Sequence, residues 1–172
     1  MRVARSVSAV FVILVCIASA FAQSESKRGV EVFAGYTRLR SDVPCCSGNA
    51  NGYHVGAGYT PISFLLLGME FSHAFGPDPQ YVRHLHFGPQ FRFQVGALRP
   101  FGRVMGGYSE HRLGCVDLTG IASIRHSSVA FGGGVDLQVH RRLALRVISL
   151  DRIRIQDQWD TRASFGAVFL LY

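Results

Sequence analysis

Two histidines, His84 and His86, are the first residues whose spacing suggests chemistry. They lie two positions apart in a segment of alternating polarity, so on a β-strand both side chains would point to the same side, as metal ligands must. His54 occupies a similar position in an earlier segment. A metal site needs a third or fourth converging ligand, which the sequence alone does not place. We therefore expect these histidines to fill a polar interior, and we predict no metal.

The glycine run Gly132-Gly133-Gly134 is a second candidate, because glycine-rich loops can bind phosphate groups. It lies inside an alternating segment, however, and lacks the Lys-Ser/Thr sequence of a P-loop. We expect no cofactor here. The run is better explained as relief of crowding where a small barrel curves sharply.

Six charged residues lie mid-segment on the polar side of the alternation, three acidic and three basic. One charge per strand beside many glycines is typical of a narrow polar interior rather than of a water-facing surface. Because an unpaired buried charge costs several kcal/mol, each arginine should lie within salt-bridge reach of a carboxylate. The predicted lumen network comprises Glu31, Glu70, Arg92, Arg103, Asp136 and Arg146.

Alternation of apolar and polar residues runs through most of the chain and predicts β-strands rather than helices. The eight predicted strands are 29–39, 51–60, 63–75, 81–95, 100–110, 126–139, 143–153 and 161–172. The predicted long connections are 41–50, 76–80, 111–125 and 155–160, and the predicted short ones are 60–62, 97–99 and 140–142. Alternating long and short connections are typical of an up-and-down meander. Pro89 falls inside the fourth strand, where we expect a bulge.

Composition limits the classes of protein that fit this pattern. The chain has 172 residues, enough for one domain, and is 48% hydrophobic but only 17% charged, which excludes a disordered chain. After the first two dozen residues, no apolar run reaches the roughly 20 residues of a membrane-spanning helix. The net charge is +7, yet the arginines form neither a run nor a helical stripe, so we expect no nucleic-acid partner.

The N-terminus has the features of a secretory signal peptide. Arg2 and Arg5 precede an apolar stretch, and Ala20-Phe21-Ala22 forms a small-x-small cleavage site before Gln23. We predict a signal peptide over 1–22, cleavage between Ala22 and Gln23, and a β-barrel domain over 23–172.

Which face is apolar decides between a soluble and a membrane barrel. A soluble barrel hides its apolar face inside, whereas a membrane barrel exposes it to lipid. The balanced charges favour a polar interior and predict an all-β, eight-stranded antiparallel up-and-down transmembrane β-barrel. The alternative is an antiparallel sandwich with a solvated outer face, which is supported by Phe33, Phe101 and Met105 because they interrupt the polar face.

Several short segments, in this order and spacing, resemble the small bacterial outer-membrane β-barrel domain family, whose architecture is OmpA-like. They are Val30-Glu-Val-Phe-Ala-Gly-Tyr36, Phe87-Gly-Pro-Gln-Phe91, Arg99-Pro-Phe-Gly102, Gly132-Gly-Gly-Val-Asp136, Leu145-Arg146 and Phe165-Gly-Ala-Val-Phe-Leu-Leu-Tyr172. The resemblance covers the mature chain. It implies a Gram-negative outer-membrane location, contact with outer-membrane lipid and usually no enzymatic activity.

The C-terminal strand carries the expected signal for the barrel-assembly machinery. It ends in Tyr172, with Leu170 and Val168 at alternate positions. The opposite parity, which includes Phe165 and Phe169, is equally apolar, so the lipid-facing side of this strand stays open. We expect a monomer.

These features predict a structural or surface-interaction role, with an extracellular ligand that the sequence does not identify. The alternatives are a narrow pore, a lipid A-modifying enzyme and a secreted soluble barrel. His126-Ser127-Ser128 resembles the His-x-Ser pair of outer-membrane lipid A deacylases, but Val129 replaces their asparagine and the pair has inward parity. We therefore predict no enzyme and no catalytic residues.

Three cysteines remain after signal removal, namely Cys45, Cys46 and Cys115. Exported proteins meet an oxidising compartment, where cysteines tend to pair. A bridge between Cys45 and Cys46 would be strained, so we expect one of them to pair with Cys115 across the barrel mouth. The sequence does not decide which one.

Overall fold

The structure is a computed structural model that describes residues 28–41, 48–76, 81–113 and 122–171. The predicted signal peptide with its cleavage site at Ala22 and Gln23, the cysteines Cys45, Cys46 and Cys115, and Tyr172 lie outside these residues. Within the described ranges, no helix is long and apolar enough to span a membrane.

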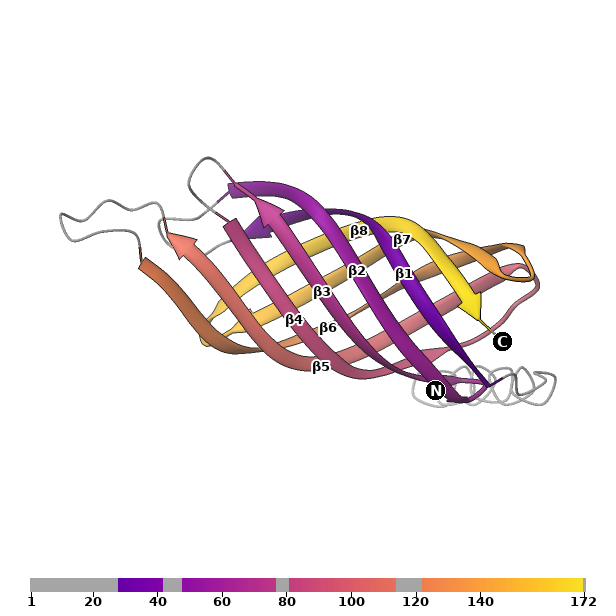
Figure 1. Ribbon diagram of the computed structural model, residues 1–172. Coiled ribbons are helices and arrows are strands. Elements are labelled where there is room, and N and C mark those ends of the chain that lie inside the picture. The colour runs from indigo at the N-terminus through magenta and orange to yellow at the C-terminus, as the bar shows by residue number, and fades with distance from the viewer. Residues whose placement is uncertain (1–27, 42–47, 77–80, 114–121, 172) are drawn as a thin grey trace, which may run out of the picture.

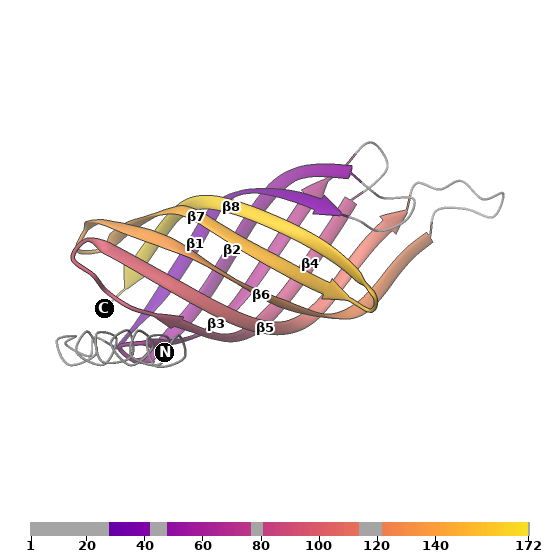
Figure 2. The same ribbon diagram turned by 180° about the vertical axis from the view of Figure 1, so that it is seen from behind.

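Eight antiparallel strands form a closed barrel, in which each strand pairs with its sequence neighbours and β1 also pairs with β8 (Figures 1 and 2). The strands are β1 Gly29–Ser41, β2 Gly48–Ile62, β3 Leu65–Phe75, β4 Tyr81–Arg92, β5 Leu98–Leu113, β6 Ala122–His140, β7 Leu143–Ile155 and β8 Gln158–Leu171. Closure confirms the predicted fold class and excludes the sandwich alternative.

The two ends of the barrel differ, and we name them by their connections. At the turn end lie the connections 63–64, 93–97 and 141–142, together with Gly29 and Leu171, the first residue of β1 and the last of β8. At the loop end, β1, β3, β5 and β7 finish. All strands have at least 11 residues, enough to cross a membrane, which takes about 9–11 tilted residues.

Several predicted boundaries need correction. Strands β5 and β6 extend further toward the loop end than predicted, so their connection is shorter. The predicted long loop 155–160 is instead a two-residue turn, in which Gln156 has a φ of 54°. β4 ends at Arg92 rather than at 95, and a bridge between Val95 and Leu98 closes its hairpin around Gly96, whose φ is 61°.

The predicted bulge at Pro89 is wrong. Phe87 aligns with Gly106 and Gln90 with Arg103, which is the same register on both sides of the proline. On its other side Pro89 aligns with Leu67 in an unbroken ladder to β3. The missing amide therefore interrupts pairing locally without shifting the strand.

A register shift in β7 changes which residues face inward. Between Arg146 and Ser149 the strand bulges, and both Val147 and Ile148 are exposed. The inward-facing residues of β7 are therefore even-numbered before the bulge and odd-numbered after it, which places Asp151 in the interior.

The glycine run of β6 faces this part of β7 at close range. A Cβ on Gly132 would lie 2.1 Å from the Leu150 carbonyl oxygen, and one on Gly134 would lie 2.1 Å from that of Ile148. These distances leave no room for a side chain, as expected where a narrow barrel curves sharply.

The outer wall is apolar and the inner wall polar. Phe87 is 64% exposed, whereas its neighbour His86 is fully buried. Phe33, Phe101 and Met105, which interrupt the polar pattern, all face inward. In β8 the open question of parity is resolved, because Val168 and Leu170 are buried whereas Phe165, Phe169 and Leu171 are exposed.

Candidate functional site

The interior carries most of the chemistry of the molecule, and its side chains form three layers along the barrel. In the layer nearest the turn end, Arg92 and Arg99 both contact Glu31, with Arg99 at 2.9 Å. Arg146 binds Asp136 through two nitrogens, at 2.8 and 3.3 Å.

Two phenyl rings hold Arg146 in this layer. Its guanidinium carbon lies 4.3 Å from the ring centre of Phe33 and 4.4 Å from that of Phe101. The two aromatic residues that interrupt the polar face therefore make cation–π contacts with a buried arginine.

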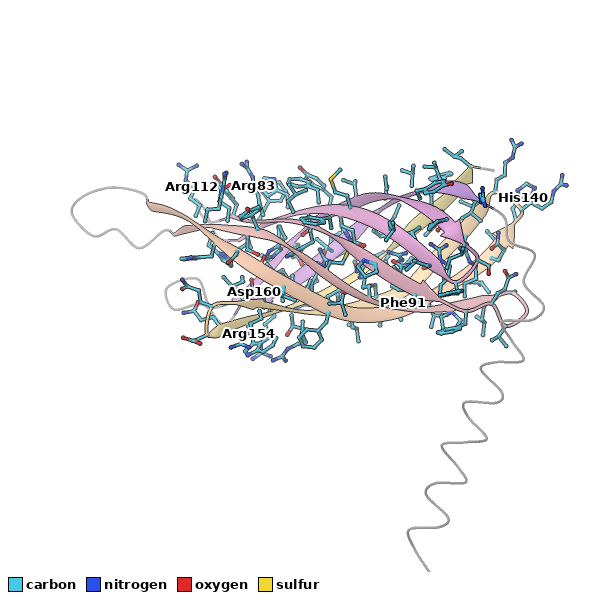
Figure 3. All side chains as sticks on the ribbon, turned by 90° about the horizontal axis from the view of Figure 1, so that it is seen from below. Arg83, Phe91, Arg112, His140, Arg154 and Asp160 are labelled. Carbon is cyan, nitrogen blue, oxygen red and sulfur yellow. The ribbon has the colours of Figure 1, made fainter. Side chains whose placement is uncertain are left out.

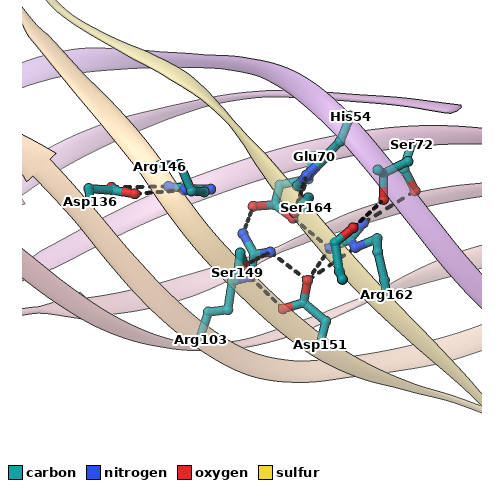
Figure 4. A network of polar contacts seen from close by, with 12 residues as sticks. His54, Glu70, Ser72, Arg103, Asp136, Arg146, Ser149, Asp151, Arg162 and Ser164 are labelled. Atoms are coloured by element: carbon teal, nitrogen blue, oxygen red, sulfur yellow. Dashed lines mark hydrogen bonds and ion pairs between the residues drawn. The ribbon is translucent and has the colours of Figure 1, made fainter. Parts of the chain in front are cut away.

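The middle layer is a four-residue ion network (Figure 4). Arg103 contacts Glu70 and binds Asp151 at 2.8 and 2.6 Å. Arg162 lies 3.0 Å from both Glu70 and Asp151. Two guanidinium groups thus share two carboxylates, and His54 adds a contact of 3.1 Å to Glu70. Pairing of this kind is what makes buried charges tolerable.

The third layer, toward the loop end, consists of histidines, serines and one carboxylate. His84 and His86 are linked through two hydroxyl groups, with His84 bonding Ser109 at 2.7 Å and His86 bonding Ser128 at 2.9 Å. The two serine oxygens are 2.8 Å apart. Asp160, the one carboxylate of this layer, lies 3.0 Å from His111 and 3.8 Å from His84.

All six residues of the predicted lumen network point into the barrel. The structure brings together Glu31 with Arg92, Glu70 with Arg103, and Asp136 with Arg146. With the buried residues that sequence reasoning missed, the described part of the interior contains five carboxylates and five arginines. They are Glu31, Glu70, Asp136, Asp151, Asp160, Arg92, Arg99, Arg103, Arg146 and Arg162.

The missed members have identifiable causes. Asp151 follows the bulge in β7, which reverses its parity. Arg99 was placed in a turn, although β5 begins at Leu98. Arg162 lies in the strand whose inward side the sequence left open. The only available signal was charge balance. If the even-numbered residues of β8 face inward, Arg162 is buried and needs a carboxylate partner.

A cavity of about 30 Å³ lies between the first two layers, room for a few water molecules at most. Near the loop end lies a cluster of buried apolar side chains that includes Leu39, Ala74 and Val82. Within the described part of the chain, no group of three or more histidine, cysteine, aspartate or glutamate side chains is placed to hold a metal ion.

The His-x-Ser segment does not form a pair. Ser128 is buried and bonds His86 and Ser109, whereas His126 is only partly buried. The serine hydroxyl therefore faces the interior, away from any lipid at the outer wall.

The outer wall has two zones. In the zone nearer the turn end, none of the outward-facing strand residues described is charged, and these residues form an apolar belt that includes Val32, Leu67, Phe87 and Phe165. At the loop end follows a rim of arginines. Figure 3 shows Arg83, Arg112 and Arg154 there, directed away from the barrel. The rim comprises Arg38, Arg40, Arg83, Arg112, Arg125, Arg152 and Arg154.

No protein-family model matches the chain, and no curated protein sequence matches it. Solved structures do. The N-terminal β-barrel domain of Pseudomonas aeruginosa OprF matches with a TM-score of 0.62 and 15% identity, over 86% of this chain and all of that one.

Two further solved structures match over a similar share of the chain. Neisserial surface protein A matches with a TM-score of 0.68 and 13% identity, over 85% of this chain and 99% of that one. Ail, the attachment invasion locus protein of Yersinia pestis, matches with a TM-score of 0.60 and 15% identity, over 86% of this chain and all of its own. At these identities the likeness is one of fold: the chain has the fold of the eight-stranded outer-membrane β-barrels.

Proposed function

We propose that this protein is a monomeric, non-conducting β-barrel of the bacterial outer membrane, with a structural or surface-interaction role. One observation carries the proposal, namely that the barrel is inside-out. Its outer wall carries an uncharged apolar belt, whereas the described residues buried in its interior include five carboxylates and five arginines. A water-facing outer wall with this many exposed Phe, Leu and Val side chains would aggregate, whereas lipid is a suitable solvent for it.

The orientation follows from the two ends. In barrels of this kind short turns face the periplasm and loops face outward, so the rim arginines would lie at the outer leaflet. Closure leaves no free strand edge for pairing with a second copy, which supports a monomer.

A pore is the runner-up, and the packing argues against it. An eight-stranded barrel is about wide enough to be filled by side chains. Here side chains occupy two successive levels of the barrel interior. Arg146 lies between Phe33 and Phe101 in the first, and the network around Arg103 occupies the second. Ion passage would require these paired groups to separate.

An enzyme acting on lipid A has weaker support. Such an enzyme needs its nucleophile on the lipid-facing wall, and Ser128 is buried in the interior.

The test is to express the full chain in a Gram-negative host and separate the two membranes by density. The protein should be found in the outer membrane, migrate faster on gels before heating than after, and give no steady conductance in planar bilayers. Recovery from the soluble periplasmic fraction would contradict the membrane placement, and discrete channel openings would favour the pore.

A further inference from the structure

A depression of about 360 Å³ lies in the outer wall at the loop end, across the adjacent strands β2 to β6. Most pockets of a barrel this narrow would lie inside it, but this one is lined mainly by outward-facing residues. They include Tyr53, Phe71, His73, Arg83, Leu85, Tyr108, Glu110 and Arg125.

Strand register arranges these residues in two rows around the barrel. The row nearer the belt contains Phe71, Leu85 and Tyr108, which are aligned across β3, β4 and β5. The row above it, nearer the loop end, contains Tyr53, His73, Arg83, Glu110 and Arg125, aligned across all five strands. The depression therefore has an apolar lower wall and a charged upper wall.

The upper wall has an excess of positive charge and unsatisfied donors. The guanidinium carbons of Arg83 and Arg112 lie 4.3 and 5.6 Å from the ring centre of Tyr81. Glu110 is the one carboxylate that lines the depression; it accepts a hydrogen bond from Tyr81 at 3.4 Å and lies 3.5 Å from Arg125. Two arginines, Arg83 and Arg125, and one carboxylate thus line the depression.

Two polar atoms in this wall have no partner within the described residues, namely Nε of Arg83 and Nε2 of His73. His73 is only 9% exposed, although it faces outward, because it stacks on Phe75 with ring centres 4.3 Å apart. A buried ring nitrogen and a guanidinium N–H beside a depression are groups that a ligand oxygen would satisfy.

We propose that this depression binds the phosphorylated sugar headgroup of an outer-leaflet glycolipid of the lipid A class. The inference rests on the proposed outer-membrane placement, which sets the lower row against acyl chains and the upper row among headgroups. Phe71 and Leu85 contact an acyl chain, Tyr53 and Tyr108 flank the sugar, and the arginines bind its phosphate, for which the guanidinium fork is suited. The charge pattern selects a phosphorylated lipid over a neutral one.

The test uses the full mature chain folded in neutral detergent and native mass spectrometry, with bisphosphorylated lipid A as the ligand. We expect a one-to-one complex, and dephosphorylated lipid A should bind at least about tenfold more weakly. The double variant Arg83→Gln/Arg125→Gln should lose that preference. The matched control Arg152→Gln/Arg154→Gln removes the same charge from β7, outside the depression, and should retain the preference within about twofold.

Glu110→Gln sharpens the test, because removing the competing carboxylate should tighten binding of the phosphorylated lipid. Equal binding of lipid A with and without phosphate by the wild type would overturn the proposal, even if a variant fails to fold. Equal losses in the two double variants would also overturn it, since they would show only diffuse surface charge. Gel mobility before and after heating reports on the barrel itself, so failure of the lipid site is distinguishable from failure of the proposed membrane placement.

Discussion

Replacing Arg146 by methionine should test how the barrel tolerates its buried charges. Methionine keeps an unbranched stem between Phe33 and Phe101, but it removes both hydrogen bonds to Asp136. Asp136 is only 2% exposed, so its carboxylate would stay in the interior without its bidentate partner. Removing one member of a buried ion pair costs about 3–5 kcal/mol.

The double variant Arg146→Met/Asp136→Leu removes both charges and should be more stable than Arg146→Met by at least about 2 kcal/mol, since a buried pair can be replaced by apolar groups at little cost. The free energy of unfolding can be measured by urea titration in lipid vesicles. Trp159, the single tryptophan, serves as the fluorescent reporter. Arg141→Met, in an exposed turn, is the control and should change stability by less than about 0.5 kcal/mol. Additive losses in the double variant would refute the reasoning.

Three further predictions follow from the wall, the strand packing and the cysteines. Phe87→Arg should lower the free energy of unfolding by about 2–4 kcal/mol because Phe87 lies in the middle of the belt, whereas Phe91→Arg, nearer the turn end, should lower it by about 0–1 kcal/mol. Equal losses in vesicle unfolding would contradict the assumed membrane depth. Gly132→Ala should impair folding because its Cβ would lie 2.1 Å from a backbone oxygen, whereas Gly106→Ala, with nothing within 4 Å, should fold normally in a gel-shift assay. Mass spectrometry of unreduced, digested protein should recover Cys115 linked to the peptide carrying Cys45 and Cys46, and a free Cys115 peptide would refute that bridge.

Strand number, topology and the inside-out arrangement were predictable because a two-residue period is a strong signal wherever a strand separates two different environments. In β4 the alternation is nearly perfect from Leu85 onward, and the structure places those residues as expected. The charges showed which side faces inward, since paired charges at mid-strand are tolerable only in a polar interior.

The remaining details depend on register, which the pattern of one strand does not contain. The bulge after Arg146 reverses parity, so Asp151 could be placed only once the pairing of β7 with β8 was known. In β8 both sides are apolar, because Val168 and Leu170 pack among interior side chains while Phe165 and Phe169 face outward. The residues that line the depression of the outer wall come from five strands, and their alignment follows from the register between these strands alone.

The central claim is that the outer wall contacts lipid while the interior does not, and tryptophan quenching by lipids brominated in mid-chain tests it most directly. In a Trp159→Phe background, one variant carries Phe87→Trp on the outer wall and the other carries Phe101→Trp in the interior, where the native ring is 6% exposed. Our account predicts strong quenching for Phe87→Trp and little for Phe101→Trp. Equal quenching at both positions, or stronger quenching for Phe101→Trp, would contradict it.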